Sequence, residues 1–210
     1  MIESFQTVRR QGTFEHTERG SRFIGLCRPI LTEEDAQALL DEARVLYPEA
    51  RHYVYAWRTN QPSFLQRFSD DGEPRGTGGR QLLEVLLGRS IDRAALVVVR
   101  YFGGILLGTG GLSRAYALAA REALEDAGPV TFIRCETFLL QADYADFHQL
   151  EGRLAAAGFF QEPPEFGVGV KQVVGATADR IEELRQLVMS SSAGRAVLAA
   201  SGLRWIEQGP

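Results

Sequence analysis

The sequence is poor in several residue types, and each shortage excludes a class of protein. Its two cysteines, Cys27 and Cys135, lie far apart and have neither the spacing of a redox pair nor that of a zinc site. We expect both to be buried thiols. No run approaches the roughly 18 apolar residues of a membrane span. No apolar signal core follows the N-terminus, so we expect a cytoplasmic protein without membrane contact.

Lysine is nearly absent, because Lys171 is the single lysine among 23 basic residues. The 27 acidic residues give a net charge of -4, and this excess lies late in the chain. Residues 1–135 hold 17 arginines and 17 acidic residues, whereas residues 136–210 hold 6 basic and 10 acidic ones. This balance argues against a generally basic nucleic-acid binder, so any contact with RNA needs a local arginine patch in the first part of the chain.

Hydrophobic periodicity divides the 210 residues into two segments, 1–134 and 135–210. The first predicts strands and helices in alternation: strands at 23–27, 52–57, 64–68, 94–101 and 130–133, and helices at 32–46, 79–87 and 112–126. The second predicts strands at 137–142, 166–176 and 203–207, and helices at 146–157 and 179–190. Together they indicate an α+β protein.

The densest group of glycines, at 103–111, lies between the strand at 94–101 and the helix at 112–126. The loop lacks the lysine of a P-loop and the third glycine of a dinucleotide fingerprint, so no cofactor is predicted. It is either a tight turn or an anion site, since helix starts offer free N–H groups and positive dipole charge. An arginine in the first helical turn favours the anion site, whose candidates are Gly108, Thr109, Gly110, Ser113 and Arg114.

A second motif covers residues 68–80 and combines three carboxylates with another glycine loop. Asp70, Asp71 and Glu73 are candidate acids and bases or magnesium ligands, although the same residues form a solvated turn, which we favour. The glycine loop that follows leads into the helix at 79–87. We expect the two loops to converge on one phosphate or backbone, the further candidates being Arg75, Gly76, Thr77, Arg80 and Arg100.

Basic and aromatic residues alternate in the strand at 52–57. Tyr53, Tyr55 and Trp57 share one face, where they either stack on bases or pack beneath a helix, and we favour packing. His52 is a candidate general base, but no nucleophile lies near it in the sequence.

Five segments resemble the YigZ/IMPACT family, and the resemblance runs along most of residues 15–130. They are 21–24, 50–52, 55–57, 68–77 and 100–116, of which Ser-Asp-Asp-Gly-Glu-Pro and Arg-Tyr-Phe-Gly-Gly-Ile-Leu-Leu-Gly-Thr-Gly-Gly-Leu are the most specific. Residues from 136 onward look like the smaller C-terminal domain of bacterial members. The chain departs from the family pattern at 78–81, where Gly-Gly-Arg-Gln replaces Ala-Gly, a basic residue and proline.

The resemblance implies a two-layer N-terminal domain of the ribosomal-protein type, like domain IV of elongation factor G, with helices on one face of a four-stranded sheet. It also implies a ferredoxin-like C-terminal domain, similar to domain V of that factor. The role of eukaryotic relatives is regulation of translation through protein contacts, whereas RNA or ribosome binding is inferred for bacterial ones.

We therefore expect a non-enzymatic regulator of translation that binds RNA, the ribosome or a translation-associated protein through the arginines and glycine loops. The alternative is an enzyme for a small phosphorylated or anionic substrate, with His52 and the carboxylates as acid and base. A third possibility, a protein-interaction module, requires exposed aromatic residues at 53, 55 and 57.

Overall fold

The computed structural model describes residues 4–59 and 64–208. The chain forms two compact units, one of residues Phe5–Thr131 and the other of the described residues before and after that range. The predicted turn with Asn60 and Pro62 lies outside the described residues. No helix in the described part of the chain is both long and apolar enough to cross a membrane.

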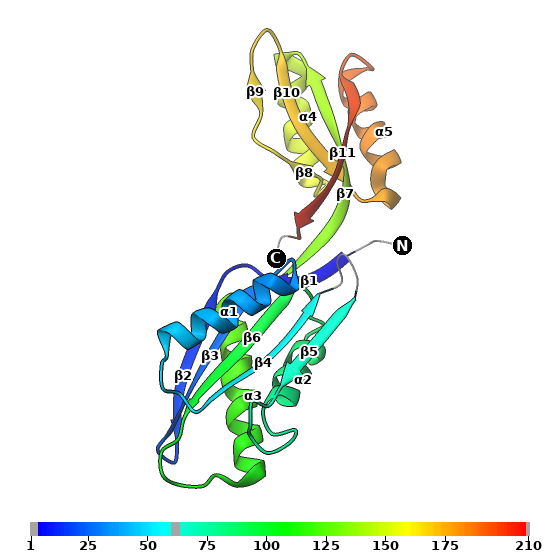
Figure 1. Ribbon diagram of the computed structural model, residues 1–210. Coiled ribbons are helices and arrows are strands. Elements are labelled where there is room, and N and C mark those ends of the chain that lie inside the picture. Colours follow the sequence, from blue (N-terminus) through cyan, green and yellow to red (C-terminus); the bar gives the residue numbers. More distant parts are fainter. Residues whose placement is uncertain (1–3, 60–63, 209–210) are drawn as a thin grey trace. The chain divides into compact units, whose positions relative to one another are not determined.

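The N-terminal unit is built on a five-stranded sheet in which every neighbouring pair is antiparallel. Its order is β2-β3-β6-β4-β5 (Figure 1), with β2 (Gly12–Glu18), β3 (Ser21–Pro29), β4 (His52–Thr59), β5 (Leu65–Ser69) and β6 (Ala94–Tyr101). The valine-rich strand predicted at 94–101 is confirmed and lies in the centre of the sheet.

Helices cover both faces of this sheet, as Figure 1 shows: α1 (Glu33–Leu46) on one side, and α2 (Gly79–Gly88) and α3 (Gly108–Ala127) on the other. Successive side chains of a strand point to opposite faces, so Leu96 and Val98 pack with α2 and α3, whereas Val97 and Val99 pack with α1. The expected two-layer arrangement of four strands with helices on one face was therefore wrong. The two-layer topology was implied by the family resemblance, and hydrophobic periodicity could not test it.

The start of α1 forms as its sequence predicts. Thr32 accepts a hydrogen bond from the backbone N–H of Asp35, whose carboxylate accepts from the N–H of Thr32 in return. This capping box satisfies amides that would otherwise lack partners.

The aromatic side chains of β4 pack beneath α1. Trp57 is buried and stacks on Tyr55, with their ring centroids 4.3 Å apart, while Tyr53 packs against the same cluster. The predicted packing role is confirmed. An interaction module that exposes this aromatic face is excluded.

The C-terminal unit places two helices on one face of a second antiparallel sheet. Its elements are β7 (Pro129–Ala142), α4 (Tyr144–Ala156), β8 (Phe160–Gln161), β9 (Glu165–Phe166), β10 (Val170–Ala176), a short 3-10 helix η1 (Ala178–Arg180), α5 (Ile181–Ser192) and β11 (Val197–Glu207). The sheet runs β7-β10-β8, with β11 also on β7 and β9 also on β10. The strand β1 (Ser4–Val8) also pairs with β7, although its residues from Phe5 onward belong to the N-terminal unit. Phe138, Leu140 and Val174 pack with Leu150 of α4 and Leu184 of α5.

Several boundaries differ from the sequence-based expectation. The strands predicted at 130–133 and 137–142 form the single strand β7, and β1 and β2 carried no prediction. Both cysteines are free and buried, as expected, and burial raises the pKa of each thiol.

Candidate functional site

Two loops of the N-terminal unit line a cavity of about 360 Å³, which we call the loop cavity. One loop joins β5 to α2, and the other joins β6 to α3. Both lie near the end of the sheet where His52 of β4 pairs with Arg100 of β6. The candidate residues that line the cavity are His52, Glu73, Arg100, Gly108 and Thr109.

A buried charged cluster forms the inner wall of the loop cavity. Arg100 Nη1 donates to Glu73 Oε1 at 2.6 Å, and the Tyr116 hydroxyl donates to the same oxygen at 2.7 Å. The side chains of Arg100 and Glu73 are 6% and 3% exposed. Burial, with the Glu73 charge close by, raises the pKa of Tyr116, so its phenol remains a donor.

Arg100 also fixes the adjoining hairpin. Its Nη2 donates to Ser21 Oγ at 3.3 Å, and that oxygen accepts the backbone N–H of Gly103 at 3.2 Å. Gly103 has to be glycine, because a Cβ there would lie 1.8 Å from the carbonyl carbon of Gly20. The β2–β3 hairpin and the β6–α3 loop are thereby held together.

His52 presents one nitrogen to the cluster. Its Nδ1 lies 2.7 Å from the carbonyl oxygen of Asp71, and since a carbonyl only accepts, this contact assigns the hydrogen to Nδ1. The other nitrogen, Nε2, lies 3.7 Å from Glu73 Oε1. A proton taken up at Nε2 would therefore sit beside a carboxylate.

The glycine loop before α2 already holds an anion of its own chain. Asp70 accepts the backbone N–H groups of Gly76, Gly78 and Gly79 at 2.8–3.0 Å. A Cβ at Gly79 would lie 2.4 Å from the carbonyl oxygen of Ser69, so only glycine fits there. An external phosphate would have to displace the Asp70 carboxylate to reach these amides, including that of Gly76.

Thr77 is likewise used internally. It is buried, and both its hydroxyl and its N–H donate to the carbonyl oxygen of Pro74, at 2.7 and 3.0 Å. It shapes the turn instead of facing a ligand, which corrects its assignment as a phosphate contact.

The three carboxylates of this loop take separate partners. Asp70 binds the amides before α2, Asp71 accepts the N–H of Tyr53 at 2.6 Å, and Glu73 binds Arg100. No group of three metal-ligating side chains occurs within the part of the chain that the structure describes. Of the three carboxylates, that of Glu73 lies 3.7 Å from His52 Nε2, and each carboxylate has a different partner, in keeping with the favoured turn.

The start of α3 differs from that of α2. The helix begins at Gly108 without a side-chain cap, four residues before the predicted start at Leu112. Ser113 and Arg114 thus fall after the first turn, which corrects their predicted position. The first turn instead holds Gly108, Thr109 and Gly110, whose amides have no partner outside the helix among the described residues.

Three exposed arginines make no ion pair or side-chain hydrogen bond with the described residues. Arg51 lines the loop cavity, Arg75 follows its lining residue Pro74, and Arg114 places Nη1 3.5 Å from where a Cβ of Gly110 would be. We call these arginines and the start of α3 the arginine-glycine face. Arg80, by contrast, pairs with Glu84 at 3.7 Å.

Sequence reasoning missed Arg51, Tyr116 and Ser21 as parts of the site. Arg51 could have been found, because it directly precedes the candidate residue His52 in the sequence. Tyr116 and Ser21 lie 43 and 79 residues from the partners they bind, and no local pattern marks them.

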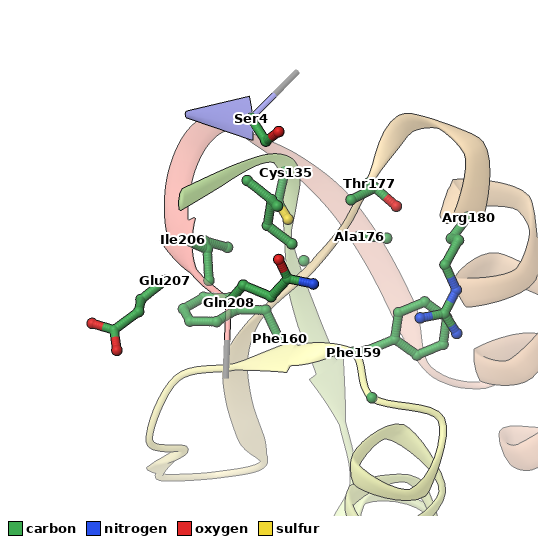
Figure 2. Close-up of a pocket in the computed structure, with 13 residues that line it drawn as sticks. Ser4, Cys135, Phe159, Phe160, Ala176, Thr177, Arg180, Ile206, Glu207 and Gln208 are labelled. Atoms are coloured by element: carbon green, nitrogen blue, oxygen red, sulfur yellow. The ribbon is translucent and has the colours of Figure 1, made fainter. Parts of the chain in front are cut away.

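A second cavity, of about 700 Å³, belongs to the C-terminal unit (Figure 2). Cys135, Phe160 and Ile206 contribute to its lining, as labelled in Figure 2. Its Arg180 is already paired with Glu183, and burial raises the pKa of the Cys135 thiol. The loop cavity is therefore the stronger candidate for polar ligands.

Comparisons with known proteins identify the family. The family model of the Impact N-terminal domain matches residues 19–124. The IMPACT family member YigZ of Escherichia coli (strain K12) is 41% identical over 140 residues, which cover 66% of this chain and 67% of YigZ. YvyE of Bacillus subtilis (strain 168) is 34% identical over 171 residues, 81% of this chain and 79% of YvyE.

A solved structure also resembles the whole chain. The crystal structure of a hypothetical protein is 32% identical, covers 96% of this chain and 98% of its own, and gives a TM-score of 0.60. The matched range 19–124 contains both loops and every residue of the loop cavity. This chain belongs to the IMPACT family.

Proposed function

We propose that this chain is a non-enzymatic regulator of translation that acts in the cytoplasm and binds RNA or the ribosome through the arginine-glycine face. Family membership supports a role in translation, which the resemblance implies for the IMPACT family. The observation that carries the binding mode is that Arg51, Arg75 and Arg114 make no ion pair with the described residues, while Arg51 and Arg114 lie beside a helix start that no described side chain caps. Guanidinium groups and free amides both bind phosphate oxygens.

The finer fold assignments are also proposals. We propose that the two units correspond to domains at 1–134 and 135–210, related to domains IV and V of elongation factor G. The order β7-α4-β8-β10-α5-β11 supports a ferredoxin-like C-terminal domain, because it follows the β-α-β-β-α-β pattern.

The binding proposal is tested with ribosomes and with structured RNA at increasing potassium chloride. Arg75→Ala and Arg114→Ala should each weaken binding by about 1 kcal/mol and flatten the dependence of log affinity on log salt by about one unit. The matched control Arg121→Ala lies further along α3, beside Glu122 at 3.5 Å, and should bind like wild type. A binding affinity that changes neither with salt concentration nor with the two substitutions would overturn the proposal.

One observation favours a second candidate, an enzyme acting on a small anionic substrate. His52 and Glu73 lie together in the loop cavity, with Nε2 and Oε1 3.7 Å apart, as an acid and a base would. Incubation with phosphorylated metabolites, followed by phosphorus NMR, should show turnover that His52→Gln abolishes. If the metabolites are unchanged, the enzyme candidate fails and the binding function is the one that remains.

A further inference from the structure

The loop cavity is large enough for a ligand and has two chemically different walls. Its volume of about 360 Å³ lies at the lower end of small-molecule sites, which span roughly 300–1,000 Å³. Phe102, Leu106 and Leu107 form an apolar wall, and Arg51, His52 and Glu73 belong to the polar one. A ligand that fits both walls carries a flat apolar part and a charged part.

Anion-binding capacity remains free at the mouth of the cavity. The amides at the start of α3 have no side-chain cap, and the guanidinium of Arg51 makes no ion pair with the described residues. Arg100, which is 5% exposed and lines the same cavity, leaves its Nε without a partner. A buried cation that is not fully satisfied adds positive potential inside the cavity.

Glu73, the carboxylate among the residues that line the loop cavity, does not cancel this potential. Arg100 pairs with Glu73, so those two charges compensate each other. The positive charge of Arg51 and the positive end of the α3 dipole are then left without a compensating negative charge among the lining residues. Both donors reach Glu73 Oε1, which leaves Oε2 without a partner among the described residues. Oε2 can therefore accept an N–H group of a ligand.

The apolar wall is exposed where a base would stack. Phe102 is 41% and Leu106 80% exposed, and both belong to the loop that leads into α3. Large apolar side chains at the rim of a charged cavity are typical of sites that take a flat ring.

We propose that the loop cavity binds one phosphorylated nucleotide, either the terminal nucleotide of an RNA or a free mononucleotide. The phosphate lies at the start of α3 beside Arg51, the base stacks on Phe102, and a base N–H donates to Glu73 Oε2. The choice of a nucleotide rests on the proposed function, whereas the cavity and its charges do not.

The test measures dissociation constants of the full chain by calorimetry. The probes are the four ribonucleoside 5′-monophosphates, the corresponding nucleosides, inorganic phosphate, and a short oligoribonucleotide with and without a 5′-phosphate. Phosphorylated probes should bind at least tenfold more tightly than their unphosphorylated forms. Tight binding of mononucleotides identifies a free nucleotide as the ligand, and tight binding of the phosphorylated oligoribonucleotide alone identifies an RNA end.

Two surface variants locate the site: Arg51→Ala changes no side chain of the buried cluster, whereas Phe102→Ala also removes a ring whose centroid lies 5.6 Å from the Arg100 guanidinium. Arg51→Ala should weaken phosphorylated probes roughly tenfold and leave nucleosides unchanged, while Phe102→Ala should weaken both by a similar factor. Arg44→Ala, an exposed arginine on α1, and Phe166→Ala, an exposed phenylalanine of the C-terminal unit, are the controls.

Equal binding of phosphorylated and unphosphorylated probes, no binding at millimolar concentration, or equal losses in the control variants would overturn the inference. Salt-dependent binding of ribosomes that fails in Arg114→Ala would still support the proposed function. A failed nucleotide site and a failed RNA-binding face thus give different results.

Discussion

The helices α2 and α3 both follow glycine-rich loops, yet their N-termini differ in what they hold. At α2, Asp70 accepts three backbone N–H groups, so a carboxylate of the chain itself occupies the position of an anion. At α3, none of the described side chains accepts a hydrogen bond from the amides of Gly108, Thr109 or Gly110. Similar sequence patterns thus give one helix start whose amides bind a carboxylate of the chain and one whose amides bind none among the described residues.

The reason lies in the residues that precede each helix. The loop before α2 contains Asp70, whereas residues 98–107 before α3 contain no acidic residue. The amides before α2 are occupied because the chain supplies a carboxylate of its own there. The search for such sites in sequences should therefore count acidic residues within about ten positions upstream.

Loss of the ion pair that joins the β5–α2 loop to β6 should have the largest effect on the free energy of unfolding. Arg100→Met leaves the Glu73 carboxylate buried without its cation, so we expect a loss of about 3–5 kcal/mol in the free energy of unfolding. Urea denaturation measures this loss. The exposed control Arg80→Met should change stability by less than about 0.5 kcal/mol, and a similar value for Arg100→Met would show that the pair does not hold the loops.

Asp70→Ala should turn the closed helix start into an open one. Removing a carboxylate that accepts three amides should cost about 2–4 kcal/mol, since hydrogen bonds to charged groups are the stronger ones. The exposed control Asp41→Ala should have little effect on urea denaturation. Added acetate or formate should recover part of the stability of Asp70→Ala but not of Asp41→Ala, and the absence of recovery would contradict the capping role.

Thr109→Asp should close the open helix start. A carboxylate in the first turn of α3 should stabilise the chain by about 0.3–1 kcal/mol through the helix dipole, and it should repel phosphate. We expect weaker binding of phosphorylated probes together with a higher melting temperature. The uncharged variant Thr109→Asn separates charge from shape; equal phosphate affinity of the two variants would argue against an anion at this position.

Loss of the capping box of α1 should have the smallest effect on the free energy of unfolding, and this effect depends on pH. Backbone N–H groups of Leu31 and Thr32 hold the pKa of Asp35 below its ordinary value of 3.8. The stabilisation is therefore present above the unfolded-state pKa and is lost as the pH falls through the lower folded-state pKa. Asp35→Asn should remove this pH-dependent part of the free energy of unfolding. The part amounts to less than about 1 kcal/mol, because the site is exposed. If the pH profile of stability is the same in Asp35→Asn and wild type, the role of the Asp35 carboxylate in the capping box is contradicted.

Local signals predicted a large share of the fold. Thr32 and Asp35 marked the start of α1, and the valine run of β6 marked the central strand. The start of α3 could not be found in this way, because Gly108–Gly111 are poor helix formers and pattern matching began at Leu112. β2 was missed because its covered positions hold Gly12, Phe14 and His16, of which only Phe14 is a large apolar residue.

The candidate site was predictable only in part, since its contacts join distant positions. The sequence marks Glu73 and Arg100 separately, but their ion pair spans 27 residues. Asp70 was grouped with Asp71 and Glu73 because they are neighbours in sequence, whereas the turn gives each a different partner. Proximity in sequence indicates shared chemistry only where the backbone keeps the side chains together.

Backbone amide NMR shifts during titration with a 5′-phosphorylated oligoribonucleotide test the contrast between the two helix starts most directly. We predict large shifts for the amides of Gly108, Thr109 and Gly110, and little change for Gly78 and Gly79, which remain bound to Asp70. Shifts at Gly78 and Gly79 without shifts at the start of α3 would contradict the account.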